Sequence, residues 1–168
     1  GNLRFAALAN VPPGTPFFPA AYWTDERPAF GIATESADLA VEACRESKSA
    51  ADAHERLTSS IEMHGKKITQ VAMELSQGRK PDGRDVRFHG IDFSLAPYPE
   101  PAISIGGALE ALTGLPLGAA GTLAAAATLT DAIQRADFPH AGFCGLMMPV
   151  LEDNVLAQKH IFSISLEI

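Results

Sequence analysis

The stretch Gly142-Phe-Cys-Gly-Leu-Met-Met-Pro-Val-Leu-Glu-Asp-Asn154 decides the expected fold of this chain of 168 residues. Its first ten residues are apolar apart from two glycines and one proline, and two carboxylates and an amide follow. A nearly continuous apolar run of this length is typical of a strand that is buried on both faces. We therefore predict a buried strand over residues 142–150 that delivers Glu152 and Asp153 to its end.

Strand-like and helix-like segments alternate on the amino-terminal side of this stretch and continue after it. Further strands are predicted over residues 3–9, 29–34, 86–95 and 161–166. Helices are predicted over residues 36–47, 49–77, 103–113 and 121–136 and from about residue 152. In the longest helix, apolar residues recur with the spacing of one helical face at Ala53, Leu57, Ile61, Ile68, Val71 and Leu75. Together these segments predict an α/β fold with buried, mainly parallel strands, forming a single unit over residues 1–168.

The composition argues against two classes of partner. The net charge is −7, and residues 91–168 contribute most of it, with 2 Lys or Arg and 8 Asp or Glu. Nucleic-acid binding requires clustered cations, which this half lacks. No apolar run approaches the ~20 residues of a membrane-spanning helix. We therefore expect neither nucleic acid nor a membrane as a partner, and a hydrophobic content of 46% indicates a globular protein.

The ends of the chain and its two cysteines suggest its context. The chain starts without Met, and apolar strand-like runs lie close to both ends. Complete domains usually begin and end in frayed polar residues. We therefore expect a piece of a longer protein, which meets the rest of its polypeptide or another subunit and forms a homo-oligomer. Because Cys44 and Cys144 are isolated in the sequence, we also expect a reducing, cytoplasmic location.

Polar side chains accompany three of the predicted strands. Glu35 follows the strand at residues 29–34, Asp92 and Ser94 lie within the next one, and Glu152 and Asp153 follow the buried stretch. Sites in parallel α/β folds form at the carboxyl ends of strands, so these side chains are predicted to converge. Paired carboxylates can act as general acid and base or bind a hard cation. Asp92, Ser94, Glu152 and Asp153 are therefore candidate catalytic residues, and Glu35 is a candidate ligand-binding residue.

A purely structural interpretation competes with this one. Ser36 and Asp153 suit the N-cap positions of helices, and Glu35 and Glu152 would then face positive helix ends. Asp92 fits it less well, because a carboxylate in an apolar strand must find a partner. The histidines show no metal-ligand spacing, so no metal is predicted, and the sequence identifies no cofactor.

Two further segments are candidate ligand sites. Gly121 and Thr122 open a helix whose free N–H groups can hold an anion, with close packing of small residues as the alternative. Residues 16–23, Pro-Phe-Phe-Pro-Ala-Ala-Tyr-Trp, form an apolar proline-rich loop. Phe17 and Trp23 are therefore predicted to close the site or to lie in an interface. Cys144 is a weaker candidate for a nucleophile, because a buried thiol without a base is usually inert.

Three segments carry a resemblance to a known family: Gly90-Ile-Asp-Phe-Ser-Leu-Ala-Pro97, Gly121-Thr-Leu-Ala-Ala125 and residues 142–153. The chain resembles the bacterial and archaeal domain-of-unknown-function 711 family, also called uncharacterised protein family 0210. The resemblance implies part of an α/β barrel with outer helices, similar to the ten-stranded barrel of glycyl radical enzymes. Family members are more than twice as long, so the chain corresponds to roughly the middle of one. The resemblance implies a fold and no reaction.

Three functional hypotheses follow from these observations. The first is an α/β-barrel enzyme or small-metabolite binder with a carboxylate-lined site at the strand ends. The second is a non-catalytic regulatory or assembly protein, whose carboxylates only cap helices and whose apolar loop is an interface. A metal-dependent hydrolase is the third.

Overall fold

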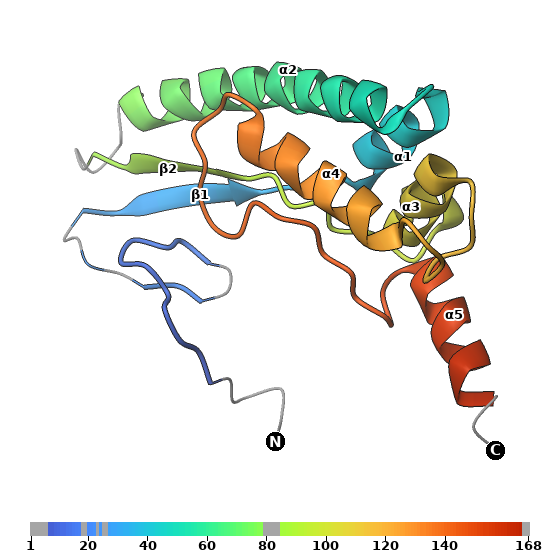
Figure 1. Cartoon of the computed structure of the whole chain (residues 1–168). Coiled ribbons are helices and arrows are strands. Elements are labelled where there is room, and N and C mark those ends of the chain that lie inside the picture. The colour runs from blue at the N-terminus through green and yellow to red at the C-terminus, as the bar shows by residue number, and fades with distance from the viewer. Residues whose placement is uncertain (1–6, 18–19, 23, 25–26, 79–84, 166–168) are drawn as a thin grey trace.

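The computed structural model describes residues 7–17, 20–22, 24, 27–78 and 85–165, with side chains as far as residue 159 (Figure 1). Strands and helices are mixed along the chain, which makes the fold α/β, as predicted. The elements in order are β1 (Ala29–Ala33), α1 (Ala37–Glu46), α2 (Ala50–Gln77), β2 (Arg87–Asp92), a 3-10 turn (Pro101–Ile103), α3 (Ile105–Thr113), α4 (Thr122–Arg135) and α5 (Asn154–Ser165).

The two strands form a parallel pair. The register runs from Ala29 opposite Arg87 to Ala33 opposite Asp92, and one shift within it places His89 in a bulge. Parallel strands require a long crossover connection, and α1 and α2 provide it. Figure 1 shows α2 along one side of the strands and the amino-terminal loop on the other.

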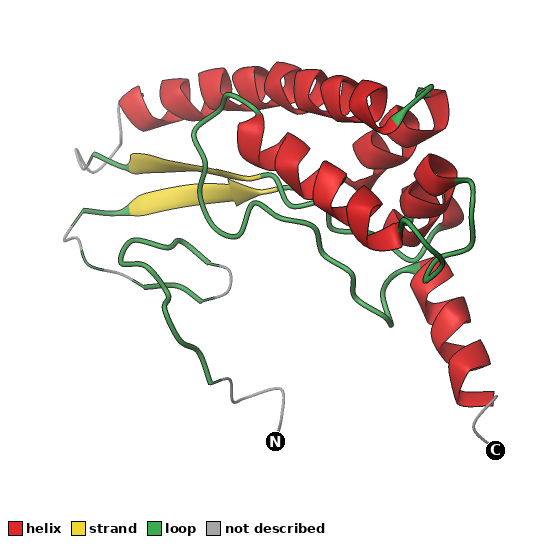
Figure 2. Ribbon diagram, viewed as in Figure 1, coloured by secondary structure: helices red, strands yellow, loops and turns green. Residues whose placement is uncertain are grey.

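A third segment runs parallel to β2 without forming a regular strand. The Ile91 N–H donates to the Pro139 carbonyl at 2.7 Å, and the Ala141 N–H donates back to the Ile91 carbonyl at 2.9 Å. Farther along, the Leu95 N–H donates to the Gly145 carbonyl at 3.2 Å. Residues 139–146 therefore lie beside β2, although Figure 2 shows loop along the whole connection between α4 and α5.

The predicted regular strand over residues 142–150 is therefore wrong. Gly142 has a φ of +69° and Cys144 has a φ of +46°, and neither value fits a strand. The N–H groups of Phe143 and Cys144 bind the Asp92 carboxylate, so they are not available to a sheet. The Asp92 carboxylate of β2 thus binds backbone N–H groups that the predicted strand would have used for pairing.

The two terminal strands were also predicted incorrectly where the structure describes them. Residues 161–165 belong to α5, because no glycine or proline follows Asp153 to end the helix. Residues 7–9 form no strand, and the remainder of that prediction, residues 3–6, lies outside the described residues. Within the described chain, no helix combines the length and the apolar character that crossing a membrane requires.

The long helix α2 has the predicted bounds. The Ser49 hydroxyl accepts from the Asp52 N–H at 3.2 Å, and the Asp52 carboxylate accepts from the Lys48 N–H at 2.8 Å. These two bonds satisfy N–H groups at the helix start. The core lies where α2 meets α1, α4 and the residues in and after β2, and its largest buried side chains are Leu57, Ile61, Ile91, Phe93, Leu95, Ile105, Leu109, Leu129 and Ile133.

The predicted apolar face of α2 is fully buried in its first half and only partly buried in its second half, where Ile68 packs against the core. Ala53, Leu57 and Ile61 are fully buried, whereas Val71 is 57% and Leu75 is 56% exposed. The carboxyl-terminal half of the helix therefore carries two large apolar side chains, Val71 and Leu75, that are more than half exposed.

Candidate functional site

The segments that follow β1 and β2 meet in a network of polar groups. The Thr34 N–H donates to the Asp92 carbonyl oxygen at 3.0 Å, and the Thr34 hydroxyl donates to the same oxygen at 3.3 Å. The Ser36 hydroxyl donates to the Ser94 carbonyl oxygen at 3.1 Å. Residues 34–36 and 92–94 therefore lie side by side.

Asp92 is the central side chain of this network and is only 2% exposed. Its Oδ1 accepts from the Ser94 N–H at 3.1 Å, from the Ser94 hydroxyl, and from the Cys144 N–H at 2.9 Å. Its Oδ2 accepts from the Phe143 N–H at 2.8 Å. These donors provide the partners that a buried carboxylate requires. Asp92 thus holds residues 142–145 against the end of β2.

Glycine is required at position 142 for this contact. A Cβ atom on Gly142 would lie 2.5 Å from the Asp92 Oδ2, and its positive φ disfavours other residues. The Ser94 hydroxyl oxygen also accepts from the Gly145 N–H at 3.3 Å. Asp92 and Ser94 therefore fix the loop at residues 142–145 from two sides.

Glu35 and Ser36 differ in exposure. Glu35 is exposed, and its backbone forms an isolated bridge with Leu95. Ser36 is buried and occupies the N-cap position of α1, but it makes no side-chain cap bond. Its hydroxyl binds Ser94 instead, so the prediction that the Ser36 side chain caps α1 is wrong. Glu35 is the exposed carboxylate at these strand ends.

Asp153 caps two helices at once and is 1% exposed. Its Oδ2 accepts from two N–H groups at the start of α3, at 2.6 and 3.3 Å. Its Oδ1 accepts from two N–H groups at the start of α5, both at 3.0 Å, and from a hydroxyl at 2.7 Å. The donors are the N–H groups of Ile105, Gly106, Val155 and Leu156 and the hydroxyl of Ser104.

The structure thus does not join all the predicted site residues. Asp153 shares no hydrogen-bond partner with Asp92 among the described residues, and Glu152 beside it is exposed. The contacts of Asp153 are those expected from the structural interpretation, in which this residue caps a helix. Asp92, Ser94 and the backbone of Glu35 lie at the ends of β1 and β2, whereas Glu152 and Asp153 lie at the start of α5.

Gly121 and Thr122 lie at the start of α4. Gly121 is exposed with a φ of +95°. The Thr122 hydroxyl donates to the Ala119 carbonyl at 2.9 Å and accepts from the Gly118 N–H at 3.1 Å. These local bonds hold the turn before the helix, so the Thr122 side chain stabilises the start of α4.

The proline-rich loop covers the middle of the strands. A Cβ atom on Gly31 would lie 2.9 Å from the Phe17 ring, and the His89 Nδ1 lies 3.0 Å from the Gly14 carbonyl oxygen. A cavity of about 280 Å³ lies here, and its walls do not include Asp92 or Ser94. Phe17 therefore lies against β1 in this cavity and not over the strand-end network, and Trp23 lies outside the described residues.

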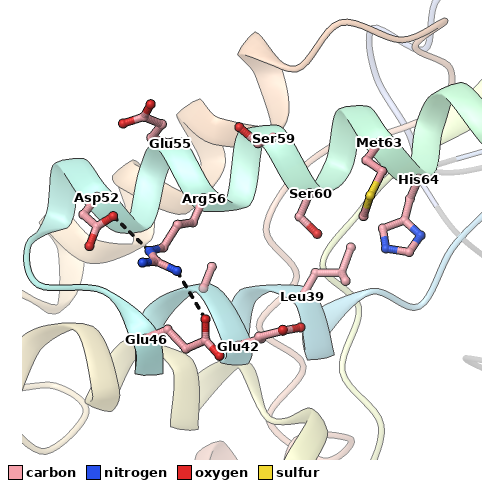
Figure 3. A pocket seen from close by; sticks show the side chains of 11 residues that line it. Leu39, Glu42, Glu46, Asp52, Glu55, Arg56, Ser59, Ser60, Met63 and His64 are labelled. Atoms are coloured by element: carbon pink, nitrogen blue, oxygen red, sulfur yellow. Dashed lines mark hydrogen bonds and ion pairs between the residues drawn. The ribbon is translucent and has the colours of Figure 1, made fainter.

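A second depression, the α1–α2 groove, was not predicted from the sequence (Figure 3). Glu42 and Glu46 line it from α1, and Asp52 and Glu55 line it from α2. Arg56 bridges the helices, with Nε 2.9 Å from Asp52 and Nη1 3.2 Å from Glu46. The Lys48 N–H and Arg56 hold the pKa of Asp52 below its ordinary value. These contacts make the groove an ion-paired surface.

No group of three or more His, Cys, Asp or Glu side chains that could hold a metal ion occurs in the described part of the chain. The His54 Nε2 lies 2.8 Å from Asp131 and links α2 to α4. The His140 ring stacks on Phe138 at 3.8 Å, and its Nε2 lies 2.9 Å from the Ala136 carbonyl oxygen. These histidines therefore have structural contacts.

The two cysteines are free and buried. Burial raises the pKa of Cys44 to about 11. Burial also raises the pKa of Cys144, and the neighbouring Asp92 carboxylate raises it further. The Cys144 thiol donates to the carbonyl oxygens of Ile91 at 3.3 Å and Ala141 at 3.2 Å. Its contacts are those of a core residue.

We predict that both thiols resist alkylation in the native protein. At pH 8, iodoacetamide should label Cys44 at least about 100-fold more slowly than in denaturant, and Cys144 should also react more slowly there, because the thiolate is the reactive species. The Cys44 rate should keep rising until the pH approaches 11. Mass spectrometry of timed samples from Cys44→Ser and Cys144→Ser measures each thiol separately. Native labelling of Cys144 as fast as that of free glutathione would contradict the prediction.

Comparison with known proteins identifies the family. The profile of the family described as Uncharacterised ACR (DUF711) matches residues 1–166. The chain belongs to the DUF711 family. Several curated relatives carry the name UPF0210 protein. That of Pyrobaculum arsenaticum is 35% identical over 162 residues, which cover 92% of this chain and 35% of the relative.

Other relatives of this DUF711 chain come from distant organisms. UPF0210 protein MK1214 of Methanopyrus kandleri is 31% identical over 99% of this chain and 38% of the relative. The protein of Lacticaseibacillus paracasei is 29% identical over 98% of this chain and 38% of the relative. The chain therefore spans little more than a third of the length of these curated relatives. No solved structure matches it.

Sequence reasoning missed two glycines that position the network of this DUF711 chain. Gly90 has a φ of +130°, and a Cβ atom there would lie 2.6 Å from the Pro139 carbonyl oxygen. Gly142 allows the equally close approach of Asp92. A glycine within a strand often marks a bulge or a close backbone contact, so the Gly90 in the apolar segment at residues 86–95 was the available signal.

Proposed function

We propose that this chain supplies part of the site of an α/β enzyme or small-metabolite-binding protein. The site lies where the ends of β1 and β2 meet the loop at residues 142–145. One observation carries the proposal: a fully buried carboxylate, Asp92, is used to fix a loop at the strand ends. Sites require groups that are held rigidly before the ligand arrives.

The residues of this site have different roles. Asp92 and Ser94 are positioning residues, because the Asp92 oxygens already accept four hydrogen bonds from the protein. Glu35 is exposed and supplies the carboxylate that meets the ligand. Phe143, 45% exposed, offers an apolar wall. This combination suits a small metabolite that carries a hydroxyl or amino group next to an apolar part.

The other candidate residues have no part in this proposed site. Asp153 is occupied by two helix starts, and Glu152 lies beside it. Gly121 and Thr122 open α4, and Phe17 lines the cavity beneath β1. The proposal therefore reduces the catalytic and ligand-binding set to Glu35, Asp92, Ser94 and the loop.

We further propose that the sheet belongs to a larger α/β barrel. The parallel pairing of β1 and β2 supports this proposal, as do the parallel bridges that Ile91 of β2 and Leu95 just after it form with residues 139–146. Two parallel strands do not form a stable sheet alone. The remaining strands would come from the rest of the polypeptide.

A thermal-shift screen of the full-length protein tests the site. Phosphorylated, carboxylate and amine metabolites are added separately, and a ligand at 100 times its Kd stabilises the protein by about 2.7 kcal/mol. We expect at least one such shift in the wild type and its loss in Glu35→Gln and Phe143→Ala. Glu42→Gln, an exposed carboxylate of α1, is the control. A ligand shift that Glu35→Gln and Phe143→Ala leave unchanged would refute the site.

A non-catalytic assembly protein is the second candidate. Leu151 is 87% and Leu123 is 85% exposed, and large exposed apolar side chains favour an interface. Such a protein would form a stable homo-oligomer and give no shift in the metabolite screen. Light scattering of the same samples distinguishes the two candidates.

A further inference from the structure

An open cavity, which we call the α2–Phe138 cavity, lies between α2 and the residues that follow α4. It has a volume of about 550 Å³. Its walls are Lys66, Thr69 and Gln70 of α2 and Asp137, Phe138 and Pro139 after α4. None of these residues belongs to the strand-end network, so the cavity is separate from the site proposed above.

Phe138 gives this cavity a fixed apolar wall. Its ring stacks on the His140 ring at 3.8 Å and meets the Phe93 ring edge-on at 5.5 Å. A Cβ atom on Gly65 would lie 3.0 Å from the Phe138 Cβ, so this glycine allows Phe138 to pack closely on α2. These contacts hold the wall in place before any ligand arrives, as a binding site requires.

The Thr69 hydroxyl in the same cavity lacks a partner. Its oxygen atom is buried, and it makes no hydrogen bond with any described residue. A threonine within a helix can bond the carbonyl oxygen four residues earlier, as Thr58, Thr128 and Thr130 do here. Buried polar atoms are nearly always hydrogen-bonded, so the Thr69 hydroxyl is a group to which a ligand in the cavity would bind.

Two opposite charges line the cavity without neutralising each other. Lys66 and Asp137 are both exposed, and neither forms an ion pair with the other or with another described residue. The Asp137 backbone is held in place, because its N–H donates to the Glu62 Oε1 at 3.1 Å. A cation and an anion on the walls of one cavity are complementary to a ligand that carries both charges.

We propose that the α2–Phe138 cavity binds a small zwitterion, an α-amino acid with an apolar side chain. Its carboxylate lies toward Lys66 and accepts a hydrogen bond from the Thr69 hydroxyl. Its ammonium group lies toward Asp137, and its side chain packs against Phe138. This inference does not depend on the proposed site at the strand ends.

Isothermal titration calorimetry of the full-length protein tests the ligand class with three matched probes. L-leucine carries both charges, 4-methylpentanoate lacks the ammonium group, and 3-methylbutylamine lacks the carboxylate. We expect L-leucine to bind with a Kd below about 1 mM and each of the other two at least about 10-fold more weakly, because each loses one charged contact. Binding of the acid or the amine as tight as that of L-leucine would overturn the inference, and so would a failure of L-leucine to bind.

Charge-removing variants of the full-length protein locate the site. We expect Lys66→Met and Asp137→Asn each to weaken L-leucine binding at least about 10-fold. The control is Lys67→Met, which removes the neighbouring lysine from a groove beside β1 and should change the Kd less than about 2-fold. Glu35→Gln, at the strand ends, should leave the Kd equally unchanged. Equal losses in the two lysine variants, or a loss in Glu35→Gln, would overturn the inference.

Thr69→Val separates the ligand contact from a structural role. Valine has nearly the same shape without the hydroxyl, so the Tm without ligand should not fall, because no hydrogen bond to a described residue is lost. L-leucine should bind at least about 5-fold more weakly, because its carboxylate loses a donor. A Tm lower by more than about 3 °C would show that the hydroxyl has a structural partner. That result, or unchanged L-leucine binding, contradicts the inference.

Discussion

Replacing Asp92 with alanine is expected to lower the free energy of unfolding by about 3–4 kcal/mol. The substitution removes the acceptor of four hydrogen bonds. The N–H groups of Cys144 and Phe143 then lose the carboxylate that they bind. Each buried donor left unsatisfied costs about 1–3 kcal/mol. Urea denaturation, followed by far-UV circular dichroism, measures the change.

Two matched variants make the Asp92 result specific. Asp92→Asn keeps the shape but replaces one acceptor oxygen with an NH₂ group that faces backbone donors, so it should lose most of the same free energy. Asp137→Ala removes an exposed carboxylate from the loop after α4 and should change stability by less than about 0.5 kcal/mol. A loss below about 1 kcal/mol in Asp92→Ala would show that the loop is held by other contacts.

Replacing Asp153 with alanine is expected to cost about 2–4 kcal/mol, because one substitution removes the cap of two helices. The loss should be localised, with faster amide exchange at the starts of α3 and α5. Glu152→Ala, the exposed neighbour, is the control and should have an effect within about 0.5 kcal/mol. Similar losses in Asp153→Ala and Glu152→Ala would contradict the double-cap description.

The double variant of Asp92 and Asp153 then tests whether the two carboxylates form one site. Their hydrogen-bond partners are separate, so the two losses should add to within about 0.5 kcal/mol. A coupling above about 1 kcal/mol would restore the shared site that the sequence predicted.

The helices could be predicted from the sequence because their signals are local. The spacing of apolar residues in α2 and the Ser49 cap depend on neighbours within the same helix. Only the second half of its apolar face was misjudged, since the sequence shows that a face is apolar but not what covers it.

The segment at residues 142–150 could not be predicted because its conformation depends on a distant side chain. Its composition suits a buried strand, but Asp92, some fifty residues earlier, binds the N–H groups that a strand would use. For the same reason the importance of Asp92 could be predicted and its partners could not. A carboxylate in an apolar strand needs hydrogen-bond donors, so the sequence alone shows that Asp92 matters. The donors are mostly backbone N–H groups, and the sequence does not show which of these groups will lie near Asp92.

The bulge at His89 has a consequence for how this segment can change in evolution. Side chains along a strand point alternately to the two faces, so one residue more or fewer reverses every position beyond it. The extra residue at His89 therefore sets the face on which Ile91 and Asp92 lie. Replacing His89 by another residue type would leave Asp92 on the same face of the strand. Deleting one residue there would turn Asp92 away from the loop at residues 142–145. We expect homologous sequences to vary in the side chain here and to preserve the length.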